Sequence, residues 1–201
     1  GVDLEKFAAH PLPSKPGEPV FVMIARVLND KGVREYAEAA RSVQARVPGV
    51  RFILIGAHDT GPEYVPAADL ARWQAEGLID YRGAVADVRP IIAETDVAVL
   101  PSYYLEGTPR ALMEAAAMGR PIVTTDTAGC RDTVVPGESG YLCEPRDARD
   151  LADKLLRLAE MPAETLAGMG AASRRHAEAV FDERIVIDAY RSAVHGALAG
   201  K

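Results

Sequence analysis

Short apolar runs alternate with longer segments of helical period along most of the chain. The clearest runs, VFVMIA and VAVL, contain no polar residue, as is typical of strands that are buried on both faces of a sheet. Turn-forming residues such as Gly56 stop several of the runs. Together the runs predict strands at residues 20–25, 51–55, 79–82, 97–100, 122–125 and 140–143.

Apolar residues recur at helical intervals in the segments between these runs. Pro48-Gly49 and Gly119 close two of the segments, as proline and glycine commonly do at helix ends. The pattern predicts helices at residues 32–47, 67–76, 88–94, 110–118, 148–160, 163–179 and 183–198. Strands that alternate with helices predict an α/β fold: a Rossmann-like parallel sheet with helices on both faces.

The first segment has a different character, because residues 1–19 contain four prolines and several polar residues but no periodic pattern. Pro11, Pro13, Pro16, Gly17 and Pro19 predict an extended linker rather than a packed element. Residues 20–201 are then expected to form one domain. The chain opens with Gly-Val-Asp instead of Met, which we interpret as the sign of a fragment.

Composition narrows the range of functions. The 201 residues carry a net charge of -6, which argues against a broad basic surface for nucleic acid. No apolar run approaches the roughly 20 residues of a membrane span, and no signal peptide is visible. Cys130 and Cys143 fit a reducing compartment and are expected to be buried apolar side chains.

Ligands bind parallel sheets at the carboxyl ends of the strands, so the residues that follow each strand are the candidates. Arg26 ends the first predicted strand, and Lys31 opens the helix after it. Two cations at this edge suit a diphosphate, which Arg binds bidentately and Lys binds as a point charge. Taken alone, the same two residues are equally consistent with exposed surface charges.

The segment after the strand at 97–100 gives the strongest signal. Thr108 is predicted to be the N-cap of the next helix, with Pro109 as its first residue. Gly107 lets the backbone approach a ligand. The free amides of Gly107, Thr108 and Arg110, together with the helix dipole, therefore predict a phosphate site.

Glu106 precedes this helix and Glu114 lies about one and a half turns inside it. The alternative is that Glu106 is a helix-end charge and that Glu114 lies on a solvated face. Apolar residues surround Glu114 on both sides, so we expect it to be buried, and a buried carboxylate needs a partner. Two carboxylates beside a phosphate site suit the vicinal hydroxyls of a ribose or a hexose.

The ordered segments ARVLNDKG, RFILIG, IDYRGAV, LPSYYLEGTPRALMEAAAMGRPIVTTDTAGCRD and GESGYLCEPRD resemble the C-terminal domain of family 4 glycosyltransferases. These enzymes are retaining and have the two-domain GT-B architecture. The resemblance covers nearly the whole chain and implies a donor-binding domain that contacts a nucleoside-diphosphate sugar. It identifies residues 1–19 as the interdomain exit segment and residues 20–201 as the nucleotide-sugar-binding domain with its C-terminal helices.

The resemblance also implies roles for single residues. Arg26 and Lys31 would bind the donor diphosphate and assist catalysis. Glu106 would contact the donor sugar at the reaction centre, and Glu114 would hold the ribose hydroxyls. The loop of Gly107, Thr108 and Pro109 would lie beside the phosphates, and Ala84 and Val85 would line the base pocket.

The Glu-Gly-Thr-Pro-Arg version of the motif resembles members that build bacterial surface polysaccharides, often from UDP-sugars. Arg110 either touches the donor or forms a surface ion pair. The resemblance implies no metal and no cofactor. It implies a glycan or lipid-linked acceptor held by an N-terminal domain, and a cytoplasmic protein, peripheral at the inner membrane face in its full-length form. The fragment alone is expected to be inactive.

Three alternatives fit less well. A sugar-nucleotide epimerase shares the architecture, but the catalytic acids and histidine expected of it are not found. A non-catalytic α/β module such as a receiver domain would carry an acidic cluster after the first strand, where Arg26 and Lys31 stand instead. A dehydrogenase would carry a G-x-G-x-x-G turn, and none follows residues 20–25 or 51–55.

Overall fold

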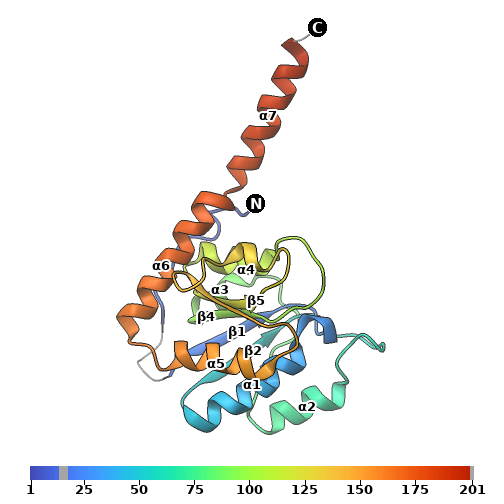
Figure 1. The fold of residues 1–201 in the computed structure, drawn as a ribbon. Helices are drawn as coiled ribbons and strands as arrows, with labels where there is room; N and C mark the ends of the chain where they lie inside the picture. Colours follow the sequence, from blue (N-terminus) through green and yellow to red (C-terminus); the bar gives the residue numbers. More distant parts are fainter. Residues whose placement is uncertain (14–17, 200–201) are drawn as a thin grey trace.

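A computed structural model describes residues 1–13 and 18–199 and contains one parallel sheet covered by helices (Figure 1). The strands are β1 (Val20–Ile24), β2 (Arg51–Ile55), β3 (Asp80–Tyr81), β4 (Val97–Leu100), β5 (Ile122–Thr125) and β6 (Gly140–Cys143). The α-helices are α1 (Val33–Arg46), α2 (Ala67–Ala75), α3 (Arg89–Ala93), α4 (Arg110–Ala117), α5 (Ala148–Ala159), α6 (Ala163–Val180) and α7 (Glu183–Ala199).

The predicted α/β class and every predicted strand and helix are confirmed, with ends that differ by a residue or so. Two short 3-10 helices, η1 (Asn29–Lys31) and η2 (Arg131–Thr133), were not predicted.

The strand order is β3-β2-β1-β4-β5-β6, and all neighbours run parallel. The chain therefore builds one half of the sheet outward from β1 through β2 to β3. It then returns to the centre and builds the other half from β4 through β5 to β6. Helices α1, α2 and α5 lie on one side of the sheet, and α3 and α4 lie on the other (Figure 1). The connections after β1 and β4 leave toward opposite faces, which opens a crevice at the carboxyl ends of these two strands.

Large apolar side chains fill the space between the sheet and α1. Phe21 of β1 stacks on Phe52 of β2 with ring centroids 5.1 Å apart, and Tyr36 of α1 meets Phe52 edge-on at 5.5 Å. The Tyr36 hydroxyl donates to the Ile53 carbonyl oxygen at 3.2 Å, so its one polar atom is satisfied. Cys130 and Cys143 are buried free thiols, as predicted, and burial raises the pKa of Cys143 to about 12.

The N-terminal segment corrects one prediction. Residues 4–7 form a turn, in which the Phe7 amide donates to the Asp3 carbonyl oxygen, and Val2, Leu4 and Phe7 are buried, so this part of the segment is packed on the domain. Val2 forms an isolated parallel bridge with Asp182, between α6 and α7. Pro16 and Gly17 of the predicted linker lie outside the described residues. The assignment of residues 1–19 to an interdomain connection stays a prediction.

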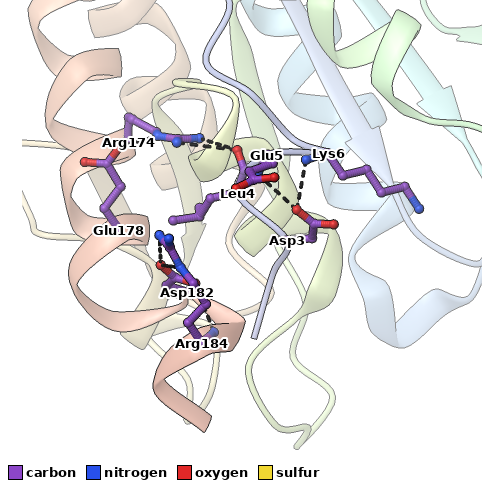
Figure 2. A network of polar contacts seen from close by, with 8 residues as sticks. All are labelled: Asp3, Leu4, Glu5, Lys6, Arg174, Glu178, Asp182 and Arg184. Carbon is purple, nitrogen blue, oxygen red and sulfur yellow. Dashed lines mark hydrogen bonds and ion pairs between the residues drawn. The ribbon is translucent and has the colours of Figure 1, made fainter. Parts of the chain in front are cut away.

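Two arginines hold this segment in place, and composition alone could not reveal them. Arg174 of α6 donates to the carbonyl oxygens of Phe7 at 2.9 Å and Ala117 at 2.5 Å. It also reaches the Leu4 carbonyl oxygen at 3.5 Å, as Figure 2 shows. Arg120 is fully buried and donates to the carbonyl oxygen of Pro11 at 3.1 Å. Burial lowers the pKa of Arg120 to about 10, so its guanidinium stays charged at neutral pH.

The last helix leaves the body of the domain. After α6, helix α7 projects away from the sheet as a separate rod (Figure 1). It exposes large apolar side chains, with 71% of Tyr190 accessible to solvent. The others are Ile185, Val186, Ile187 and Val194. No helix among the described residues has both the length and the apolar character needed to cross a bilayer.

We predict that Arg174→Ala releases the N-terminal segment without unfolding the sheet. Hydrogen bonds from a charged donor contribute about 1.5–3 kcal/mol each, and Arg174 makes two short ones, so the free energy of unfolding should fall by about 3–6 kcal/mol in chemical denaturation. Amide hydrogen exchange at Val2, which donates to the Phe181 carbonyl oxygen at 2.7 Å, should accelerate. Arg175→Ala is the matched control, because Arg175 is the exposed neighbour on the same helix. Equal stability of the two variants would contradict this account of the segment.

Candidate functional site

One ion pair of the predicted site connects the segment after β1 with the segment after β4, at the crevice. Lys31 belongs to η1, which follows β1, and Glu106 lies in the loop that follows β4. The Lys31 Nζ and Glu106 Oε1 atoms are 2.5 Å apart, and the two side chains are only 11% and 21% exposed. The structure therefore brings together a cation and a carboxylate that are 75 residues apart in sequence.

Ser102 forms a hydrogen bond with Glu106 and was not identified from the sequence. Its hydroxyl donates to Glu106 Oε1 at 3.0 Å and accepts a hydrogen bond from the Tyr104 amide at 3.3 Å. Thr125 at the end of β5 donates to the Ser102 carbonyl oxygen. Ser102 is fully buried and comes two residues after β4, so its place after a strand was the available signal.

Two tyrosines of the same loop contact cations. The Lys31 Nζ lies 4.8 Å from the centroid of the half-exposed Tyr104 ring, within the range of a cation–π contact. The Arg146 guanidinium lies 4.4 Å from the centroid of the Tyr103 ring. Desolvation by burial raises the pKa of the Tyr103 phenol, with a further contribution from the charge of Glu35. Tyr103 therefore stays protonated at neutral pH.

Glu114 and Arg110 form the second ion pair of the site. Glu114 is buried, as predicted, and Arg110 Nε donates to its Oε1 at 2.9 Å across one turn of α4. The arginine side chain is 79% exposed, whereas the glutamate side chain is 12% exposed. Arg110 thus supplies the partner that a buried carboxylate requires.

The start of α4 differs from the prediction by one residue. The N-cap is Pro109, whose ψ of 122° is extended, and the helix begins at Arg110. Thr108 is therefore not the N-cap, and no side chain caps the helix. No acceptor for the main-chain amides of Gly107, Thr108 and Arg110 is found within the described residues. These donors and the positive end of the helix dipole remain available to an anion.

A cavity of about 160 Å³ lies where these groups meet. It is lined by Ile24, Ala25, Lys31, Leu100, Glu106, Pro109, Arg110 and Ala111. Sites for whole drug-sized ligands measure roughly 300–1,000 Å³, so this cavity suits one phosphate group or one sugar ring. Lys31, Glu106, Pro109 and Arg110 are the predicted residues that the structure places around it.

Other predicted residues do not line this cavity. Arg26 is exposed after β1, and its side chain forms no ion pair with the part of the chain that the structure describes. Ala84 is exposed and Val85 is half-buried in the connection after β3, which is the edge strand. Their predicted roles toward the diphosphate and the base remain predictions.

Two glycines allow the main chain to close around the Glu106 loop. A Cβ on Gly129 would lie 2.4 Å from the Glu106 carbonyl oxygen, and one on Gly32 would lie 2.1 Å from that of Pro101. Both glycines have a positive φ, of 80° and 77°. The sequence analysis assigned no role to Gly129, because the contact joins segments on two different connections.

We predict that Gly129→Ala destabilises the protein more than Gly137→Ala. Gly137 is a matched control, because its φ of 81° equals that of Gly129 within a degree while a Cβ there meets no atom within 4 Å. The left-handed conformation costs an alanine about 1–2 kcal/mol at either position. The clash with the Glu106 loop should add about 1–3 kcal/mol at Gly129 alone, measured by chemical denaturation. Equal losses of stability in the two variants would show that the Glu106 loop moves aside at no energetic cost.

Comparisons with known proteins agree with this architecture. The chain is 34% identical over 143 residues to the N,N'-diacetylbacillosaminyl-diphospho-undecaprenol alpha-1,3-N-acetylgalactosaminyltransferase of Campylobacter jejuni, covering 71% of this chain and 36% of that protein. It is 29% identical to the putative colanic acid biosynthesis glycosyltransferase WcaL of Escherichia coli, covering 92% of this chain and 47% of that protein. The chain thus spans less than half the length of either relative.

A solved structure shows the same fold. HepE of Anabaena in complex with UDP superposes with a TM-score of 0.82 at 20% identity, covering 98% of this chain and 56% of HepE. This likeness confirms the predicted Rossmann-like half of a GT-B fold. The family model for glycosyl transferases group 1 matches residues 18–161, which is most of the chain. The chain therefore belongs to the family of glycosyl transferases group 1.

Proposed function

We propose that this chain is the donor-binding domain of a retaining glycosyltransferase and that its donor is a UDP-sugar. The observation that carries the proposal is the cavity between β1 and β4, where Lys31, Glu106 and the start of α4 converge. A cation and free amides suit a phosphate, and a carboxylate suits sugar hydroxyls. The UDP bound to HepE and the sugar transfer named for the Campylobacter relative support the same assignment.

The leaving diphosphate gains negative charge in the transition state of such a transfer. Lys31, Arg26 and the amides at the start of α4 would stabilise this charge, because they are the cations and free donors that follow β1 and β4 at the carboxyl edge of the sheet. We propose that these groups suffice without a metal ion or a cofactor. Glu106 would position the sugar and is not assigned as a nucleophile.

Glu114 would hold the ribose of the donor. Arg110 occupies Oε1 of the carboxylate, which leaves Oε2 to accept hydrogen bonds from the ribose hydroxyls. In this arrangement Arg110 orients the Glu114 carboxylate, so the two alternatives for Arg110, a donor contact and an ion pair, are combined in one role. It forms an ion pair and lines the donor cavity at the same time.

The acceptor would be a hydroxyl of a glycan or of a lipid-linked glycan. We propose that an N-terminal domain of a longer protein binds it, because the chain matches only 36% and 47% of its two relatives. The donor-binding domain alone would then bind nucleotide without completing the transfer. The reaction would take place in the cytoplasm, at the inner face of the membrane.

A thermal-shift panel with UDP, GDP, ADP and dTDP tests the proposal. UDP should raise the melting temperature of the chain most. A ligand at about 100 times its Kd adds roughly 2.7 kcal/mol of stability, which is large enough to measure. The shift should be the same with and without magnesium. A preference for another base would correct the donor, and a shift that requires magnesium would contradict metal-free binding.

A second test separates the phosphates from the nucleoside. Arg26→Ala should weaken UDP binding about tenfold in calorimetry, the loss expected for one charge-assisted contact, and should leave uridine binding unchanged. Arg51→Ala is the control, because Arg51 is an exposed arginine at the opposite, amino-terminal edge of the sheet. Unchanged UDP affinity in Arg26→Ala would remove Arg26 from the diphosphate site.

A further inference from the structure

Lys31 is already engaged by an anion of the protein. Its Nζ contacts Glu106 Oε1 at 2.5 Å on one side and the Tyr104 ring at 4.8 Å on another. With 11% of its side chain exposed, Lys31 has little open surface left for a second anion. A diphosphate and the Glu106 carboxylate would therefore compete for the same ammonium group.

Both groups carry negative charge, so a diphosphate bound to Lys31 would also repel the Glu106 carboxylate. The partly buried site screens this repulsion less than water does. Glu106 would have to leave Lys31 when a diphosphate arrives. The main chain of its loop is held two residues earlier, because the Tyr104 amide donates to the Asp30 carbonyl oxygen at 3.2 Å. The side chain, rather than the loop, is the part that can turn.

A displaced carboxylate needs new donors. Leaving Lys31 and the Ser102 hydroxyl costs Glu106 two charge-assisted hydrogen bonds, at 2.5 Å and 3.0 Å. The hydroxyls of a donor sugar can replace them, whereas UDP without a sugar offers no donor at that position. A nucleotide that carries its sugar therefore compensates the cost of displacing Glu106 better than UDP does.

We propose that Glu106 is a specificity-determining competitor for Lys31, which penalises UDP relative to UDP-sugar. This inference rests on the proposed function and adds a role for the free carboxylate. After sugar transfer, Glu106 loses its sugar hydroxyls and returns to Lys31. The same ion pair thus favours release of the UDP product.

Calorimetric titration with UDP tests the competition in three variants of this chain. Glu106→Gln keeps the size of the side chain and removes the competing charge, so it should bind UDP about fivefold to tenfold tighter than the unmodified chain. Lys31→Met should lose UDP binding. Glu138→Gln is the matched control, because Glu138 is exposed on a distant turn, and it should leave the affinity unchanged. Circular dichroism confirms that each variant is folded.

The outcomes separate the two hypotheses. UDP affinity that is equal or lower in Glu106→Gln, with binding lost in Lys31→Met, overturns the competition and leaves the proposed function standing. Binding of UDP by Lys31→Met as tight as by the unmodified chain overturns the competition and the role of Lys31 together. No binding of UDP at millimolar concentration, in Glu106→Gln as well as in the unmodified chain, overturns the proposed function and this inference with it.

Discussion

The pairing of β1 with β4 is the constraint on which the candidate site depends. Phe21 and Val22 lie in register with Val97 and Ala98, and the Val20 amide donates to the Asp96 carboxylate at 2.8 Å. These strands are 73 residues apart from the end of one to the start of the next, so only the sheet brings their carboxyl ends together. If the register slipped by one residue, the loop that carries Glu106 would shift along η1 and the Lys31 contact would be lost.

Charge balance within the crevice explains why a buried site can contain so many ionisable groups. Each of the two carboxylates has a cation of the site as its partner, Lys31 for Glu106 and Arg110 for Glu114. A buried charge without a partner would cost several kcal/mol, so these pairs are conditions of stability as well as binding groups. A ligand that binds here therefore replaces a partner in one of these existing ion pairs.

Local patterns were enough to predict the fold. Apolar runs and helical periods act over a few residues, and the strands and helices they predicted are present. The positions of Lys31 and Glu106 at the sheet edge also followed, because the carboxyl end of a strand is visible in sequence, and the burial of Glu114 followed from its apolar neighbours. Ser102 and Gly129 were not recognised, since their roles arise from contacts across different connections. The N-terminal segment was misjudged for the same reason, because its packing depends on Arg174 and Arg120 from distant helices and turns.

The bridge between Val2 and Asp182 has a mechanical consequence. It joins the N-terminal segment to the base of α7, and Arg174 fastens that segment to the end of α4. Helix α7 has 17 residues, so as a rigid rod it is roughly 25 Å long. Such a rod would act as a lever arm, since a rotation of about 10° at its base would move its tip by roughly 4 Å. A tilt of the sheet domain too small to change any contact around Lys31 would then displace the tip of α7 by about the width of a side chain.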